Sequence, residues 1–175
     1  MIIRCTQKLL PELKKPQTLQ EPISEDPFWS WHANLFQIEM RKCVLITNDA
    51  TLFTMFIPAL KKQDFESFHL VVGQHLFKNL VYENIPQRQI EAVLSDCENI
   101  KYGKTINRSV LGSMNDKKTQ LEYLISAEGG LARTDIYELN HKMNRIISRV
   151  ADYKTPIEMF KDKLMEVTEQ CASLC

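Results

Sequence analysis

The sequence predicts an α+β fold, and three observations lead to that prediction. A β-meander is indicated from Trp29 to Pro58, with its strands near residues 32–58, because apolar and polar residues alternate there between turn signals. Apolar residues recur at helical spacing in most of the chain after Asp64. The 175 residues are 44% apolar and 25% charged, an ordinary globular composition. We therefore expect one domain over residues 1–175, with a mostly antiparallel sheet of about four or five strands covered by amphipathic helices.

The N-terminal part of the chain predicts a strand followed by a linker. Residues 2–6 are typical of a strand, and residues 7–14 of a short helix. Residues 15–27 hold three prolines and three acidic residues, a composition that indicates an extended acidic connection without structure of its own.

The meander is predicted from alternation and from turn residues. Apolar residues alternate with polar ones from Phe36 to Met40, and a polar pair at residues 41–42 indicates a turn. The continuous apolar run Cys43–Ile46 predicts a central strand that is covered on at least one side. Asn48 and Asp49 form the next turn signal, and Pro58 ends the last strand.

The remaining segments predict helices with one apolar face each. Asp64 is the expected cap of a helix over residues 65–81, and Pro86 the first-turn residue of a second helix. Thr134 is expected to begin a third helix that continues to Val150. The residues Thr155-Pro156-Ile157-Glu158 form a capping box with proline at the first helical position.

Cysteine usage and the lack of long apolar runs predict the compartment. Five cysteines are an odd number without a Cys-x-x-Cys motif, which favours free thiols and a cytoplasmic protein. No signal peptide is recognisable, and no apolar run approaches the length of about 18 residues that a membrane span needs. Cys171 and Cys175 have no histidine or acidic residue at a zinc spacing, so we expect neither a metal nor a cofactor.

The polar stretch Lys104–Asp116 joins a strand predicted near residues 100–103 to a long amphipathic helix. Ser113 and Asp116 fit a capping box, which predicts that this helix starts at Ser113 after a glycine turn at Gly112. A helix start carries unpaired N–H groups and partial positive charge, so it attracts anions. Five basic residues and one acidic residue lie between residues 101 and 118, although the whole chain has zero net charge.

These features define the candidate functional residues. His32 and Asn34 are two apart on a predicted strand, so their side chains point to the same face. The candidate ligand-binding residues are Asn34, Lys104, Arg108, Ser109, Gly112, Ser113 and Asn115. His141, Arg145 and Arg149 form a basic stripe with the spacing of a helix, which suits a phosphate backbone or a solvated surface. The alternative for the stretch is purely structural, with caps, a turn and solvated lysines.

Four polar blocks together resemble a known protein family. The blocks are Arg4-Cys5-Thr6-x-Lys8-Leu9, Trp31-His32-Ala33-Asn34-Leu35, Arg41-Lys42-Cys43-Val44-Leu45 and Lys104-Thr105-x-x-Arg108-Ser109-Val110-Leu111-Gly112-x-Met114-Asn115-Asp116. They are similar to a bacterial family of small proteins classified as a domain of unknown function, whose relatives occur on plasmids and other mobile elements. The resemblance covers residues 2 to about 145 and implies that the polar blocks, rather than the helices, are the family signature; it implies no activity, cofactor or partner.

Three functional hypotheses follow. In the first, the stretch 104–116 binds a phosphate-bearing partner, a nucleotide or a nucleic acid. In the second, the protein is a metal-independent phosphodiesterase or nuclease-like enzyme, with His32 as general acid or base, Arg108 stabilising negative charge, and Ser109 or Asn115 orienting the substrate. In the third, it is a protein-interaction domain. No P-loop or nucleophile elbow narrows the choice.

Overall fold

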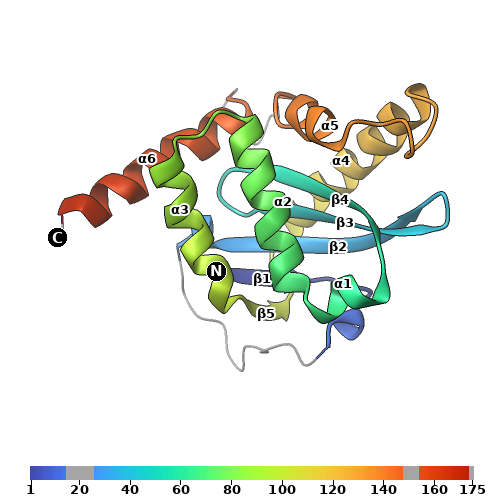
Figure 1. Ribbon diagram of the computed structural model, residues 1–175, viewed down its shortest axis with the longest axis horizontal. Coiled ribbons are helices and arrows are strands. Elements are labelled where there is room, and N and C mark those ends of the chain that lie inside the picture. Colours follow the sequence, from blue (N-terminus) through green and yellow to red (C-terminus); the bar gives the residue numbers. More distant parts are fainter. Residues whose placement is uncertain (15–25, 148–153, 174–175) are drawn as a thin grey trace.

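The computed structural model describes residues 1–14, 26–147 and 154–173, which form one five-stranded sheet with helices on both faces (Figure 1). The strands are β1 (Ile2–Cys5), β2 (Ser30–Ile38), β3 (Arg41–Asn48), β4 (Thr54–Leu60) and β5 (Lys101–Lys104), in the sheet order β4-β3-β2-β1-β5. The helices are α1 (Lys62–Glu66), α2 (Phe68–Tyr82), α3 (Gln87–Ser95), α4 (Arg108–Ala127), α5 (Ile136–Met143) and α6 (Pro156–Ser173), with 3-10 turns η1 (Leu10–Glu12), η2 (Pro27–Trp29) and η3 (Asp96–Asn99).

The α+β prediction is confirmed, and the sheet is mostly antiparallel. The longer pairs, β2 with β3 and β3 with β4, are antiparallel and form the expected meander. β1 pairs in parallel with both β2 and β5, which the pattern of one sequence does not reveal. The first hairpin turns at Glu39 and Met40, one step before the expected polar break, because both residues adopt positive φ (48° and 64°) and β3 already begins at Arg41.

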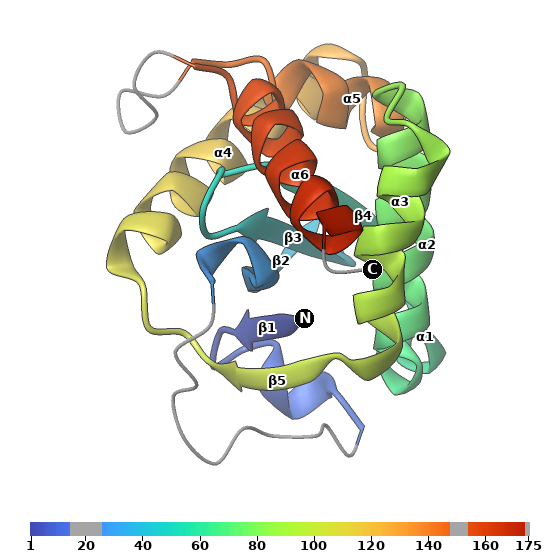
Figure 2. The same cartoon turned by 90° about the vertical axis from the view of Figure 1, so that its left-hand side faces the viewer.

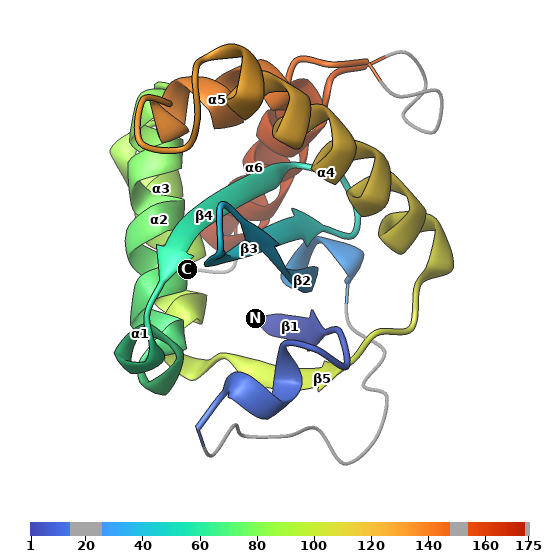
Figure 3. The same cartoon turned by 90° about the vertical axis from the view of Figure 1, so that its right-hand side faces the viewer.

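One face of the sheet is covered by α2, α3 and α6 and is apolar. Figures 2 and 3 show α2 and α3 on one side of the strands and α4 on the other, with α6 across one end of the strands, where Phe160 and Leu164 join the core of the α2 side. The odd-numbered residues of β2 point to the first side, where Trp31 is 2% exposed. Its ring lies edge-on to that of Phe160 from α6, and Phe160 also contacts Phe28 and Phe53. This aromatic cluster fixes α6 on the sheet.

The other face combines a smaller apolar core with polar side chains. Leu45 and Phe56 of the sheet pack with Val110, Met114 and Leu121 of α4. Further along the same face the sheet presents the even-numbered residues of β2 and Arg4 of β1, which begin the polar region described below.

α5 covers the edge strand β4 through two asparagines. Asn144 accepts a hydrogen bond from the backbone N–H of Thr54 (2.7 Å) and donates to its carbonyl (2.7 Å). Asn140, one turn earlier, accepts from the backbone N–H of Phe56 (2.8 Å) and donates to its carbonyl oxygen (3.4 Å). The two side chains thus take the place of a sixth strand, because they form hydrogen bonds with backbone N–H and C=O groups of β4 that would otherwise be unpaired at the edge of the sheet.

Several helix boundaries in the structure differ from those predicted from the sequence. The helix expected over residues 65–81 is two helices, α1 and α2, and Asp64 lies in the first turn of α1. The cap of α5 is Asp135, not Thr134, because the Asp135 carboxylate accepts from the N–H groups of Tyr137 and Glu138. α5 also ends at Met143, well before Val150.

Other expectations hold or lie outside the described residues. The capping box before α6 is confirmed, since Thr155 and Glu158 exchange hydrogen bonds. Most of the acidic connection, residues 15–25, lies outside the described residues, and Pro27 already belongs to η2.

Three of the five cysteines have side chains within the described part of the structure. Cys5, Cys43 and Cys97 are free and buried, and burial raises the pKa of the Cys5 and Cys97 thiols to about 12, so these groups are unreactive. The side chains of Cys171 and Cys175 lie outside the described part. Among the helices that the structure describes, none combines the length and the apolar character of a membrane span.

Candidate functional site

The helix after the polar stretch begins at Arg108, not at Ser113 as expected. Asn107 is its N-cap, because the Asn107 side-chain oxygen accepts hydrogen bonds from the N–H groups of Ser109 (3.0 Å) and Val110 (3.3 Å). Gly112 and Ser113 therefore lie inside α4, where their N–H groups belong to the helix ladder rather than to an anion site. The capping-box prediction fails because a stronger cap occurs six residues earlier.

Most of the predicted ligand-binding residues lie on the outside of this region. Lys104, Arg108, Ser109 and Gly112 are exposed. No ion pair joins Arg108 to Asp116 among the residues that the structure describes. These residues are accessible to a partner, and none of the four lines the polar pocket described below.

His32 is fully buried and holds the start of α4 against the sheet. Its Nδ1 lies 2.6 Å from Oδ1 of Asp49, and its Nε2 lies 3.3 Å from the backbone nitrogens of Ile106 and Asn107. Backbone N–H groups can only donate, so Nε2 is the acceptor and the ring proton sits on Nδ1, toward Asp49. In this arrangement both ring nitrogens of His32 are occupied inside the protein, and neither His32 nor Arg108 lines the polar pocket described below.

A chain of polar side chains continues from His32 to β1. The second carboxylate oxygen of Asp49 accepts a hydrogen bond from Ser30 Oγ (2.9 Å), and Ser30 Oγ accepts one from Arg4 Nε (3.2 Å). Arg4, Ser30 and His32 are 6%, 5% and 0% exposed, respectively. Sequence reasoning missed Arg4, Ser30 and Asp49, although Ser30 and His32 have the two-residue spacing of one strand face.

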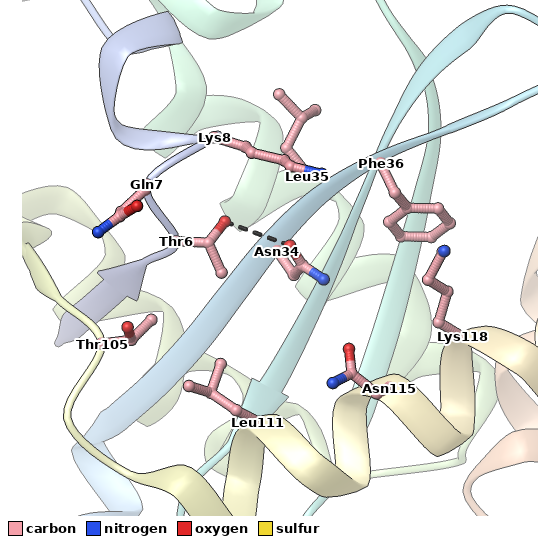
Figure 4. A pocket seen from close by; sticks show the side chains of 10 residues that line it. All are labelled: Thr6, Gln7, Lys8, Asn34, Leu35, Phe36, Thr105, Leu111, Asn115 and Lys118. Carbon is pink, nitrogen blue, oxygen red and sulfur yellow. Dashed lines mark hydrogen bonds between the residues drawn. The ribbon is translucent and has the colours of Figure 1, made fainter.

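A polar pocket lies beside this chain, between β2 and the first half of α4 (Figure 4). Its volume is about 470 Å³, and its lining residues are Thr6, Gln7, Lys8, Asn34, Leu35, Phe36, Thr105, Leu111, Asn115 and Lys118. Of the predicted site residues, Asn34 and Asn115 line it together. The pocket exists because β1 ends at Cys5 and β5 at Lys104, whereas β2 continues to Ile38 and leaves a notch that α4 roofs.

The side chains of the pocket come from separate segments that the fold brings together. Leu111, Asn115 and Lys118 have helical i, i+4 and i+7 spacing, so they project from one face of α4. Asn34 Oδ1 accepts a hydrogen bond from Thr6 Oγ1 (3.2 Å), and Figure 4 shows the Asn34 amide nitrogen on the side away from Thr6. The Asn34 N–H groups are thereby directed into the pocket as donors.

The pocket is basic and has one aromatic wall. None of its ten lining residues is acidic, and two of them are lysines, Lys8 and Lys118. Lys118 Nζ lies 5.5 Å from the centre of the Phe36 ring and 3.3 Å from Glu122 on the outer surface of α4. The pocket therefore offers positive charge, hydrogen-bond donors and an apolar ring, but not the carboxylate or imidazole ligands that bind most metals. No metal-binding cluster of His, Cys, Asp or Glu occurs elsewhere in the described ranges.

Lys117, the neighbour of Lys118, is buried beneath α4 instead. Its Nζ donates to the carbonyl of Leu52 (2.6 Å) and to Thr54 Oγ1 (2.8 Å). Burial lowers the pKa of Lys117 to about 7. The sequence gives no sign of this difference, because adjacent residues of a helix point in directions about 100° apart.

Two residues of the predicted basic stripe, His141 and Arg145, are already paired, and the third, Arg149, lies outside the described residues. Glu83 is 4% exposed and receives two hydrogen bonds from Arg145, each 2.8 Å long. His141 Nδ1 lies 3.1 Å from the same carboxylate. These contacts join α2 to α5 and give the two stripe residues a structural role.

Comparison with known families adds one finding. Residues 2–159 match the model of a family described as a domain of unknown function, DUF6933. No curated protein matches the chain. Because the family model covers most of the sequence, including every strand and the pocket, the chain belongs to the DUF6933 family.

Proposed function

We propose that this domain binds a small phosphate-bearing molecule, a mononucleotide, in the pocket between β2 and α4. The observation that carries the proposal is that Lys8, Lys118 and the amides of Asn34 and Asn115 line one pocket that has no lining carboxylate. Phosphate oxygens are bound by such combinations of ammonium groups and amide N–H donors.

The position of the pocket in the fold supports the proposal. The parallel strands β1 and β5 both end at it, and ligands of open sheets bind outside the carboxyl ends of parallel strands. Its volume of about 470 Å³ lies within the range of small-molecule sites. The ring of Phe36 gives the pocket an apolar wall, and Lys118 Nζ lies over this ring.

As in the first hypothesis from the sequence, the ligand carries a phosphate, but other basic residues now bind it. Asn34 and Asn115 remain ligand-binding candidates, while Lys8 and Lys118 replace Arg108 as the phosphate partners. Exposed Lys104 and Arg108 add positive charge near the pocket, which attracts an anion over a range of about 10 Å at ordinary salt.

Isothermal titration calorimetry with a panel of mononucleotides tests the proposal. We expect saturable binding that weakens about 10- to 100-fold in Lys118→Met, since a charge-assisted hydrogen bond contributes about 1.5 to 3 kcal/mol. Lys78→Met is the matched control, because Lys78 is an exposed lysine on α2, on the other face of the sheet. Absence of saturable binding, or equal binding by Lys118→Met, would contradict the proposal. Tight binding of oligonucleotides alone would assign the site to a nucleic acid.

The enzyme hypothesis gains no support from the geometry around His32, since its ring nitrogens are engaged with Asp49 and with two backbone N–H groups. It stays a hypothesis for the exposed residues Arg108 and Ser109. Incubation with a model phosphodiester, followed by detection of the released alcohol, tests it.

A protein-interaction role is the second candidate function, because α2 presents apolar side chains to solvent. Leu70 is 58% exposed and Phe77 is 40% exposed beside a groove of about 330 Å³ that reaches Gly73 and Leu94. Light scattering of the wild type and of Leu70→Lys tests whether this surface associates.

The free thiols at Cys5, Cys43 and Cys97 agree with a cytoplasmic location, and an origin on bacterial mobile elements is an inference from the resemblance alone.

A further inference from the structure

Helix α2 is apolar on two faces, of which the fold buries only one. Its inner face packs into the core on the sheet. On its outer face Leu70, Phe77 and Val81 are 58%, 40% and 48% exposed. A surface helix of a globular protein typically has a single apolar stripe, so a second stripe indicates a contact made outside the domain.

The outer face borders an apolar groove between α2 and α3, which lie side by side (Figures 1 and 2). Gly73 lies at the middle of the α2 wall, with Leu70 about one turn before it and Phe77 about one turn after it. Leu94 of α3 and Cys97 of η3 form the opposite wall. The groove is therefore lowest where α2 has no side chain and is flanked by two large apolar side chains.

The packing of the domain does not require glycine at residue 73. Glycine inside a helix is less stable than alanine. A methyl group on Gly73 would meet only Cys97 Cβ, at an ordinary contact distance of 3.8 Å. The domain thus has room for alanine there, and what glycine adds is access for a second backbone from outside.

We propose that two copies of this chain associate through this groove, with their α2 helices antiparallel and a twofold axis beside Gly73 and Gln74. Leu70, Gln74, Phe77 and Val81 are spaced by four, three and four residues, the repeat with which paired helices form a seam. An antiparallel pair brings Leu70 of each copy against Phe77 of the other, so the surface is complementary to itself. Gln74 then faces Gln74 of the second copy, and an amide can both donate and accept a hydrogen bond.

The charges around the groove also favour a second copy. Residues 68–82 contain no acidic residue, and the outer side of α2 carries His69 and Lys78, both exposed. The opposite wall, formed by α3 and η3, carries Glu91 and Asp96. Docking places the basic helix of each copy along the acidic wall of the other, and the twofold axis repeats this attraction.

The size of the face determines the expected strength of the dimer. α2 has 15 residues and is about 22 Å long, and two helices side by side are about 20 Å wide. The resulting face is about half of the roughly 800 Å² that each partner of a standard interface buries. We therefore expect a weak dimer, with a dissociation constant on the order of 100 µM. The inference rests on the protein-interaction role proposed above for this surface and is independent of the mononucleotide pocket.

Sedimentation velocity of the whole protein at about 10 to 500 µM, without nucleotide, tests the twofold arrangement. The wild type should change from monomer to dimer across this range. Gln74→Glu and Gln74→Lys should each weaken association by about tenfold, because like charges meet at the axis. An equal mixture of the two variants should associate at least as tightly as the wild type, because opposite charges then meet. A mixture that associates no more tightly than its separate components would overturn the proposal.

Gly73→Ala is the second test, with Gly112→Ala as its matched control. Gly112 lies inside α4 with no atom within 4 Å of an added methyl group, so both variants should raise the melting temperature of the dilute protein. Only Gly73→Ala should weaken the dimer, by about tenfold, since its methyl group separates the two helices.

A wild type that stays monomeric at the highest concentration, or a dimer that Gly73→Ala leaves unchanged, would overturn the proposal. If Leu70→Lys abolished the dimer while Gly73→Ala left it unchanged, the interaction role of the surface would stand and only the antiparallel arrangement would fail. Mononucleotide binding is measured on the dilute monomer, so the failure of either proposal is seen separately.

Discussion

The two faces of the sheet bury their side chains by different means. On the side of α2, α3 and α6, the strands present Trp31, Ala33 and Leu35, and the interior is almost entirely apolar. On the side of α4, the same strand presents His32 and Asn34, and buried polar groups must each find a specific partner. The first face is stabilised by area and close packing, whereas the second depends on individual hydrogen bonds and carries the candidate ligand site.

The largest expected effect concerns the apolar face. Phe160→Ala should lower the free energy of unfolding by about 3 to 5 kcal/mol, because a fully buried aromatic ring is lost and a cavity remains. Denaturant unfolding measures this, with Met165→Ala on the exposed side of α6 as a control that should change little. A loss of less than about 1 kcal/mol for Phe160→Ala would show that α6 is not part of the core.

A somewhat smaller loss is expected on the polar face. His32→Ala removes the acceptor of two backbone N–H groups and a partner of Asp49, so it should cost about 2 to 4 kcal/mol. Asn34→Ala, two residues along the same face, should cost less than about 1 kcal/mol because Asn34 lines the pocket. Urea unfolding of both variants decides the point. If His32→Ala lost no more stability than Asn34→Ala, the hydrogen bonds of His32 would not stabilise the fold, and His32 would be retained for function.

The buried amine of Lys117 should give stability a pH dependence. Its pKa is about 7 in the folded protein and 10.5 ordinarily, so between these values the unfolded chain binds the proton more strongly than the folded one. The free energy of unfolding should therefore rise with pH from this group, by at most about 1.4 kcal/mol per pH unit. Lys117→Met should remove this contribution.

The difference between wild type and Lys117→Met isolates the lysine from other titrating groups. Urea unfolding of both proteins between pH 7 and 8.5 supplies it, because the cysteine thiols, which begin to ionise toward the top of this interval, are the same in both proteins and cancel in the difference. A difference that does not change with pH would mean that the amine is solvated in the folded state.

The smallest effect is expected for Arg108. Its side chain is exposed and pairs with no acidic residue in the described structure, so Arg108→Ala should change stability by no more than about 0.5 kcal/mol. Thermal melts of the variant and the wild type measure this. A loss of about 3 kcal/mol would instead reveal a buried ion pair.

The difference between repeating apolar faces and individual polar contacts also explains what could be predicted from the sequence. The meander and most helices follow from periodicity, because an apolar face repeats along each element. The parallel pairing of β1 with β5 brings together residues about 100 apart, and local pattern cannot report it. The start of α4 was misplaced because Ser113 and Asn107 both suit a cap; in the structure the Asn107 side chain accepts from the N–H groups of Ser109 and Val110, and His32 holds the segment before Arg108.

The candidate site was predicted only in part for a related reason. Asn34 and Asn115 were identified as polar residues on suitable elements, and the fold brings both to one pocket. Arg4 and Asp49 could not be recognised as members of the polar chain, since each belongs to it only through a hydrogen bond to Ser30, which lies on another element. Lys117 and Lys118 look equivalent in sequence, yet the first is buried and the second lines the pocket.

Chemical-shift mapping tests the central claim most directly, namely that the face of α4 carries the ligand site. A nitrogen-15 labelled protein would be titrated with the mononucleotide that binds best in calorimetry, and backbone N–H shifts would be followed. We predict that the largest changes fall in residues 6–8, 34–36, 105 and 111–118, and that α2 and α3 change little. Changes centred on Leu70, Phe77 and Leu94 would contradict the account, because they would place binding on the apolar groove of the opposite face.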